Sequence, residues 1–300
     1  MVTAKVKNIE LCYAITGEQN INNIVLISGL GTQMIRWSTP FCELLAEKGF
    51  RVIRFDNRDS GCSTFLANEQ VPDSNNFLEL LRSGKEILAP YTLFDMVEDV
   101  VGLLDALSIT EAHIVGRSMG GIIAQLFASQ YPERVLSLTS IMSTSMNPAL
   151  PPTEADVMAM MIAPKPDAAY DKKANLNQRL AFAKRIAGSK FSLDEKEEIA
   201  MIEQEFVRSK NQSGGLWRQL LAIITTGYKK EYLQKIKAPT LVIHGSDDPI
   251  FLPECGIDTA RTIKRAEFML IDGMGHHIPS LLYPPIAEAI FRNAIRGSSR

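Results

Sequence analysis

The sequence predicts an α/β fold: a mostly parallel central sheet of about eight strands, helices on both of its faces, and an inserted helical cap. Short apolar runs such as residues 24–27 alternate with stretches of helical periodicity such as residues 93–107. This alternation is typical of a parallel sheet covered by helices on both sides. From about residue 148 to residue 237 the alternation stops and helical patterns alone follow, which indicates an insertion.

The expected elements follow one another in order, and turn residues bound them. Gly29 and Gly31 end the apolar run 24–27, and Gly49 closes the next helix. The expected strands cover residues 11–16, 24–27, 51–55, 114–115, 135–142, 240–243 and 267–271. The expected helices cover residues 37–48, 93–107, 122–131, 154–161, 172–187, 194–208, 216–224, about 252–261 and 286–295. Residues 65–91 carry weak signals and form either a mobile flap or a surface loop.

The pattern divides the chain into three regions. Residues 1–147 are expected to form the first part of an α/β core, residues 148–237 the helical cap, and residues 238–300 the second part of the core. Ligands of open α/β sheets bind beyond the carboxyl ends of the strands. We therefore expect the cap to lie over that edge and to cover a small-molecule site.

The composition narrows the class of partner. Of the 300 residues, 46% are hydrophobic, and the formal net charge is -2, which predicts a large core and no binding to nucleic acid or to membranes. The four cysteines have no zinc-like spacing, so we expect free thiols in a reducing compartment and no metal. We expect a cytoplasmic protein without a cofactor, either a monomer or a homodimer.

The most informative motif is Gly-Arg-Ser-Met-Gly-Gly at residues 116–121. An apolar strand precedes it and a helical run follows, which is the setting of a nucleophile elbow. Glycines let the chain turn sharply there, and they leave room for a serine in a strained backbone conformation. We predict Ser118 as the nucleophile and the backbone N–H of Met119 as one donor to an oxyanion.

A serine nucleophile needs a base, and the base needs a group that orients it. In elbow hydrolases the chain order is serine, acid, histidine. The strand at 240–243 leads into a loop with two acids, Asp247 and Asp248. We predict Asp248 as the orienting acid, with Asp247 as the alternative, because a carboxylate here could also cap the next helix.

The base is expected in the glycine-containing loop after residues 267–271, which carries two of the four histidines. We predict His276 as the base, with His277 as the alternative. The other two histidines, His113 and His244, are expected to be structural.

The second oxyanion donor is expected in the Ser-Gly-Leu-Gly loop at residues 28–31. An oxyanion hole needs two backbone N–H groups. We predict that the Leu30 N–H joins that of Met119, whereas the alternative for this loop is a plain strand-to-helix turn.

These motifs together resemble the α/β-hydrolase superfamily. Residues 54–63 resemble the Asp-x-Arg-Gly-x-Gly-x-Ser loop of its single-domain esterases. Residues 275–279, Gly-His-His-Ile-Pro, resemble the Gly-His-x-x-Pro ending of bacterial ester hydrolases such as aclacinomycin methylesterase, and proline iminopeptidases share the scaffold. The resemblance implies a cofactor-free Ser-His-Asp hydrolase with a helical cap. The serine at position 118 argues against an epoxide hydrolase or a haloalkane dehalogenase, because these relatives use an aspartate as the nucleophile.

Two positions depart from the family pattern. Ser28 stands where histidine is usual, and Arg117 stands where a small, aromatic or histidine residue is usual. A buried arginine needs a partner. We therefore expect Arg117 to be buried and paired with Asp59 or Asp56, in a structural rather than a catalytic role.

The cap is rich in methionine and contains Trp217, which predicts an adaptable apolar pocket wall. This wall favours a small to medium, mainly uncharged carboxylic ester as the substrate. The candidate pocket residues are Gly29, Trp37, Met146, Trp217 and His277.

Two other functions stay open. An aminopeptidase or amidase of the proline iminopeptidase kind would hold a substrate amine on an acid such as Glu154, Glu203 or Glu205. A small-molecule receptor of the same fold would hydrolyse its ligand slowly.

Overall fold

The computed structural model describes residues 2–67, 87–164, 166, 170–209 and 214–298. Its centre is a sheet of eight strands in the order β1-β2-β4-β3-β5-β6-β7-β8. The two pairings β1–β2 and β2–β4 are antiparallel, and the other five are parallel. The strands are β1 (Val2–Val6), β2 (Ile9–Thr16), β3 (Asn22–Ile27), β4 (Phe50–Phe55), β5 (Ala112–Arg117), β6 (Val135–Ile141), β7 (Thr240–Gly245) and β8 (Glu267–Ile271). The predicted fold class is confirmed.

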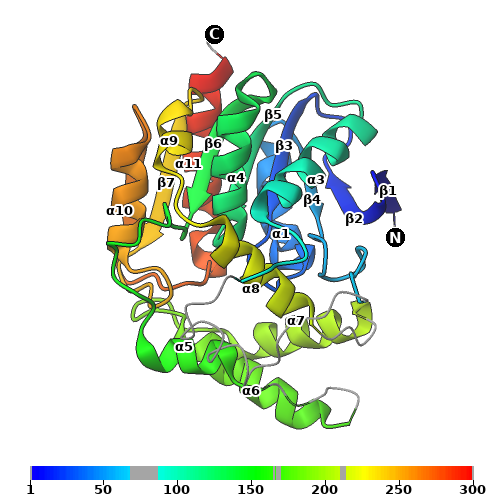
Figure 1. Ribbon diagram of the computed structural model, residues 1–300, viewed down its shortest axis with the longest axis vertical. Coiled ribbons are helices and arrows are strands. Elements are labelled where there is room, and N and C mark those ends of the chain that lie inside the picture. The colour runs from blue at the N-terminus through cyan, green and yellow to red at the C-terminus, as the bar shows by residue number, and fades with distance from the viewer. Residues whose placement is uncertain (1, 68–86, 165, 167–169, 210–213, 299–300) are drawn as a thin grey trace.

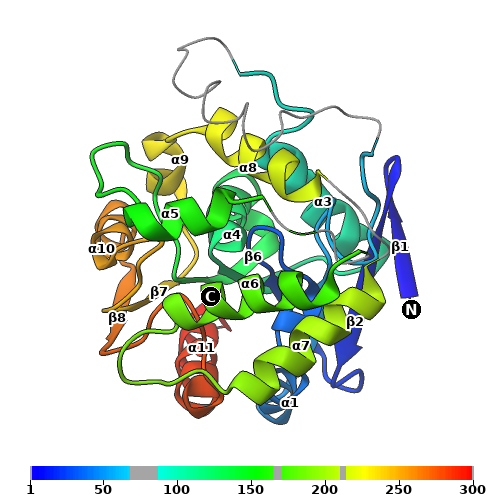
Figure 2. The same ribbon diagram turned by 90° about the horizontal axis from the view of Figure 1, so that it is seen from below.

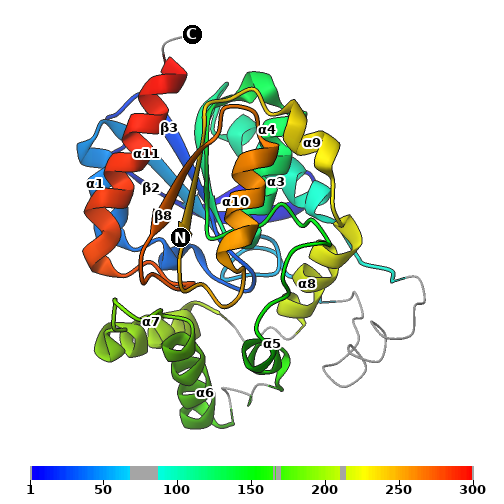
Figure 3. The same cartoon turned by 90° about the vertical axis from the view of Figure 1, so that its left-hand side faces the viewer.

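Helices cover both faces of the sheet (Figure 3). One face carries α3 (Leu93–Ala106), α4 (Met119–Gln130), α9 (Lys230–Lys235) and α10 (Pro253–Thr262). The other face carries α1 (Thr39–Glu47) and α11 (Tyr283–Ser298). Each layer encloses its own cluster of buried apolar side chains. Short 3-10 turns at Met34–Arg36, Pro132–Arg134 and Ser280–Leu282 complete the core.

A helical insertion separates β6 from β7. It contains α5 (Ala155–Ile162), α6 (Lys172–Arg185), α7 (Glu195–Arg208) and α8 (Gly215–Thr226), and within its described residues every regular element is a helix. The helices α5, α6 and α7 lie together beyond one end of the sheet (Figure 1). A view onto that end shows them spread across it (Figure 2). This is the end at which Met34–Arg36, the turn that follows β3, contacts α7.

Besides the short 3-10 turns, the described residues contain one strand and one α-helix that the sequence did not predict. Val2–Val6 pairs with β2 as an edge strand, and two of its five residues are buried. Lys230–Lys235 is a one-and-a-half-turn helix that packs on α4, and its Leu233 belongs to the main core. The last helix inside the predicted cap range therefore packs with the core layer.

Of the possible flap at 65–91, residues 68–86 lie outside the described residues. Among the helices that are described, none combines the length and the apolar character needed to cross a membrane.

Candidate active site

Ser118 lies at the sharp turn between β5 and α4. Its backbone has φ +54° and ψ -127°, a conformation that costs free energy and is found mainly where function requires it. The glycine positions on either side of the serine have no space for a side chain. A Cβ on Gly116 would lie 2.0 Å from the Gly120 carbonyl oxygen, and one on Gly120 would lie 2.3 Å from that of Ile27. The strained serine is thus held by backbone that approaches too closely for any side chain.

The structure brings Ser118, His276 and Asp248 together from three separate loops. His276 Nε2 lies 2.9 Å from Ser118 Oγ, and His276 Nδ1 lies 2.8 Å from Asp248 Oδ2. An ionised carboxylate can accept hydrogen bonds but not donate them. The Nδ1–H therefore donates to Asp248, and Nε2 is left with a lone pair that accepts the Ser118 hydroxyl proton.

Asp248 is built to stay ionised. The side chain is 2% exposed, and burial alone would raise its pKa. The His276 and His244 rings oppose this effect by charge and hydrogen bonding, and they lower the pKa of Asp248 to about 2. Its second oxygen, Oδ1, accepts the backbone N–H groups of Ile250 and Phe251 at 2.9 and 3.0 Å. The carboxylate is therefore both charged and fixed in orientation.

The two alternative residues have other surroundings. Asp247 accepts hydrogen bonds from the Ser189 backbone N–H and the Ser246 hydroxyl, which lower its pKa. His277 is partly buried, and its pKa is lowered to about 4 by burial first and then by the Arg117 and Arg36 charges. Asp248 and His276, rather than Asp247 and His277, supply the two hydrogen bonds that lead to Ser118.

The insertion holds the loop that carries His276. The His276 N–H donates to the Ile186 carbonyl at 2.7 Å, and the Gly275 N–H donates to that of Ala187 at 3.1 Å. A Cβ on Gly275 would lie 2.1 Å from the Ile186 oxygen, so these two backbones need a glycine in order to meet. The segment that follows α6 thus positions the predicted base, a contact that sequence periodicity could not reveal.

The loop after β3 lies against the serine. A Cβ on Gly29 would come 3.1 Å from Ser118 Cβ and 3.5 Å from its Oγ. Among the described residues, neither the Leu30 N–H nor the Met119 N–H donates a hydrogen bond to another residue. Both predicted oxyanion donors are therefore unpaired among the described residues.

The expected pairing of Arg117 with Asp59 or Asp56 is wrong. Arg117 donates to the Arg36 carbonyl oxygen at 3.2 Å, and its guanidinium lies 5.2 Å from the centre of the Trp37 ring. Burial, followed by the Arg36 charge, lowers the pKa of Arg117 to about 10. Arginines of the insertion occupy both carboxylates, because Arg208 binds Asp56 and Arg218 binds Asp59.

A second buried group of charges joins the insertion to the core. Arg36, just after the loop at 28–32, binds Glu198 at 2.8 Å and Glu205 at 2.9 Å, and both acids are on α7. Glu205 also binds Arg179 of α6. Glu198 and Glu205 are seven residues apart and therefore share one helix face. The spacing of these two acids is visible in the sequence, but it does not show which basic residue they bind.

The candidate pocket residues have different surroundings. Trp37 is 1% exposed and stacks on Phe41, so it has almost no surface for a substrate and its predicted place in the pocket wall is wrong. Met146 has φ +64° and packs partly buried against the core cluster of α3 and α4. Trp217 is partly buried on α8.

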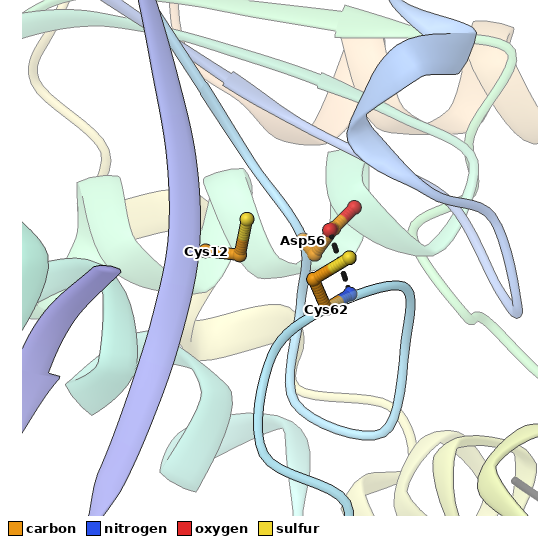
Figure 4. A group of neighbouring side chains, drawn as sticks. All are labelled: Cys12, Asp56 and Cys62. Carbon is orange, nitrogen blue, oxygen red and sulfur yellow. Dashed lines mark hydrogen bonds between the residues drawn. The ribbon is translucent and has the colours of Figure 1, made fainter. Parts of the chain in front are cut away.

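Cys12, Asp56 and Cys62 form a group whose potential ligand atoms lie within 4.8 Å of one another (Figure 4). Asp56 is already engaged by Arg208 and by the backbone N–H groups of Met34 and Cys62. Burial and the charge of Asp56 raise the pKa of the Cys12 thiol to about 11, whereas a metal ligand must be a thiolate. This arrangement fits an ion pair with Arg208 better than it fits a metal ion.

Comparison with known proteins agrees with the fold. Residues 22–280 match the model of the alpha/beta hydrolase fold family. The chain is 28% identical to rhodomycin D methylesterase from Streptomyces sp. (strain C5), with 89% of each protein covered. It is 26% identical to 3-oxoadipate enol-lactonase 1 of Acinetobacter baylyi, with 95% of this chain and 93% of the relative covered.

A solved structure extends the likeness over the full length. The enol-lactonase from Burkholderia xenovorans LB400 superposes with a TM-score of 0.68 at 24% identity and covers 100% of both chains. The family match spans most of the chain. The chain therefore belongs to the alpha/beta hydrolase family.

Proposed function

We propose that this member of the alpha/beta hydrolase family is a serine hydrolase that cleaves small to medium, mainly uncharged carboxylic esters through an acyl-enzyme. The observation that carries the proposal is a pair of hydrogen bonds: the Ser118 hydroxyl donates to His276 Nε2 at 2.9 Å, and His276 Nδ1–H donates to Asp248 Oδ2 at 2.8 Å. The relatives named as a methylesterase and an enol-lactonase support ester cleavage as the chemistry.

In the proposed mechanism His276 Nε2 takes the Ser118 proton as Oγ attacks the ester carbonyl. Asp248 stabilises the imidazolium that forms. The Leu30 and Met119 N–H groups hold the oxyanion of the tetrahedral intermediate. The imidazolium then protonates the leaving alcohol. In the second half, His276 removes a proton from water as the water oxygen attacks the acyl carbonyl. The imidazolium then returns this proton to Ser118 Oγ as the bond between Oγ and the acyl group breaks and the acid is released.

The charges of the insertion favour an ester over a peptide substrate. An aminopeptidase needs a free acid to hold the substrate amine. The three candidate acids already have basic partners: Glu205 binds Arg36 and Arg179, Glu154 binds Arg185, and Glu203 lies 3.6 Å from Lys172. A carboxylate in such a pair is less available to an incoming ammonium group.

Turnover on two substrate series tests the proposal. We expect hydrolysis of p-nitrophenyl esters of short and medium acids, and little or none of aminoacyl-p-nitroanilides. Preference for prolyl anilides would replace the proposal with the aminopeptidase alternative. Tight ligand binding with turnover no faster than that of Ser118→Ala would support the receptor alternative.

A further inference from the structure

The insertion contacts the loop beside Ser118 through a fully buried glutamine. Gln219, on α8, is 0% exposed. Its Oε1 accepts the Gly31 backbone N–H at 2.7 Å, and its Nε2 donates to the Arg58 carbonyl oxygen at 2.7 Å. One amide therefore joins the loop after β3 to the loop after β4.

The residue held by Gln219 follows Leu30 directly. Gly31 has φ +63°, and a Cβ there would lie 2.6 Å from Leu216 Cδ1, also on α8. The same helix thus covers Gly31 with an apolar side chain and binds its N–H. The rest of the loop is held from the core, because Asn57 donates to the Ser28 oxygen at 3.0 Å and Ser60 donates to that of Thr32 at 2.8 Å.

We propose that Gln219 is a positioning residue for the oxyanion site, an inference that rests on the proposed ester hydrolysis. Its bond to the Gly31 N–H fixes the peptide plane between Leu30 and Gly31, and thereby the orientation of the Leu30 backbone. An oxyanion donor acts well only when it is preorganised at hydrogen-bond distance from the developing charge. The insertion therefore contributes to the rate of the chemical step as well as to the choice of substrate.

The proposal distinguishes between two substitutions of similar size. Gln219→Leu removes the acceptor and leaves the Gly31 N–H and the Arg58 carbonyl without partners. Gln219→Glu keeps an oxygen that can accept the Gly31 N–H and, because burial favours the neutral carboxyl group, an O–H that can donate to the Arg58 carbonyl oxygen. Gln178→Leu is the matched control, because Gln178 lies in the insertion and donates to Pro164, also in the insertion.

Kinetics on p-nitrophenyl acetate test the proposal, with active sites counted by a serine-directed phosphonate so that unfolded protein does not contribute. Losing one oxyanion donor costs about 100-fold to 1000-fold in kcat, so we expect a displaced donor in Gln219→Leu to cost about 10-fold to 100-fold. KM should change by less than about threefold, because the donor acts mainly in the transition state. Affinity for a trifluoromethyl ketone, whose adduct places an oxyanion in the same site, should fall in parallel with kcat.

We expect Gln219→Glu to keep most of kcat and Gln178→Leu to equal the wild type. If the leucine variant does not fold, Gln219→Asn replaces it, since its shorter amide cannot reach both loops. Unchanged kcat in folded Gln219→Leu or Gln219→Asn, or a loss confined to KM, would overturn the role of Gln219. Failure of the proposed function is distinct: the wild type itself would then lack turnover that depends on Ser118.

Discussion

Arg218 of the insertion binds Asp59 of the core through two hydrogen bonds, Nε to Oδ2 at 2.9 Å and Nη2 to Oδ1 at 2.7 Å. The two side chains are 2% and 0% exposed. Tyr91 adds its hydroxyl to the same carboxylate at 2.7 Å. Because Asp59 lies in the loop after β4 and Arg218 adjoins Gln219, this ion pair fastens α8 beside the candidate active site.

Removing the arginine should destabilise the protein strongly. Arg218→Met leaves the Asp59 carboxylate buried without its cation, and breaking such a pair typically costs about 3–5 kcal/mol. Arg185→Met is the matched control, because Arg185 forms its ion pairs with Asp156 and Glu154 on the surface. This substitution should lower the free energy of unfolding by less than about 1 kcal/mol. Urea unfolding measures the free energy of unfolding of both variants and of the wild type. Equal losses would show that the buried pair contributes no more than the exposed ones.

For Arg117→Met we expect a much smaller change in stability than for Arg218→Met. Arg117 has no ion pair in the part of the chain that the structure describes, and a desolvated charge is itself costly. Methionine keeps a contact with the Trp37 ring, so we expect the free energy of unfolding to change by less than about 1 kcal/mol. A loss as large as that of Arg218→Met would mean that a carboxylate partner exists in solution.

Acid should destabilise the fold through His113. This side chain is 2% exposed, and burial lowers its pKa from 6.5 to about 4. The unfolded chain therefore takes up the proton before the folded one does. The contribution is fully present above pH 6.5 and is lost as the pH falls toward 4, by about 3 kcal/mol for a shift of this size.

Urea unfolding of the wild type and of His113→Leu at pH 7 and pH 4 checks this expectation. The difference between the two pH values should be smaller in the variant by about 3 kcal/mol. Equal differences, or an NMR titration of the His113 ring with a midpoint near 6.5, would contradict it.

The paired candidates should separate in kinetics. Asp248→Asn and His276→Ala should each lower kcat by several orders of magnitude, because the members of a triad act as a unit. Asp247→Asn and His277→Ala should cost far less, since neither side chain bonds to the base or the serine. Rates for the four purified variants on one ester suffice, and a reversed order within either pair would transfer the role to the neighbour.

The sequence predicted the parts of the molecule that local chemistry determines. The glycines around Ser118 identify the turn because backbone atoms approach within 2.0 to 2.3 Å of any added Cβ. Strand ends place the acid and the base at the same edge of a parallel sheet. Asp248 was predicted over Asp247 from the sequence, and the structure gives the two adjacent carboxylates different partners, His276 for Asp248 and the Ser189 N–H for Asp247.

Contacts between distant segments could not be predicted in the same way. Periodicity identifies which face of α7 or α8 is buried, but not that Arg208 binds Asp56 or that Arg218 binds Asp59. The wrong assignment of Arg117 followed from this limit: Asp56 and Asp59 do pair with arginines, but those arginines come from the insertion, about 150 residues away. The six-residue α9 was too short to show a helical period.

The nucleophile is the central claim, and covalent labelling tests it most directly. The enzyme is treated with a serine-directed fluorophosphonate, digested, and analysed by mass spectrometry alongside Ser118→Ala. We expect one labelled residue, Ser118, with loss of ester turnover in proportion to labelling, and neither label nor turnover in the folded alanine variant. Labelling at another residue, or near wild-type turnover by Ser118→Ala, would contradict the account.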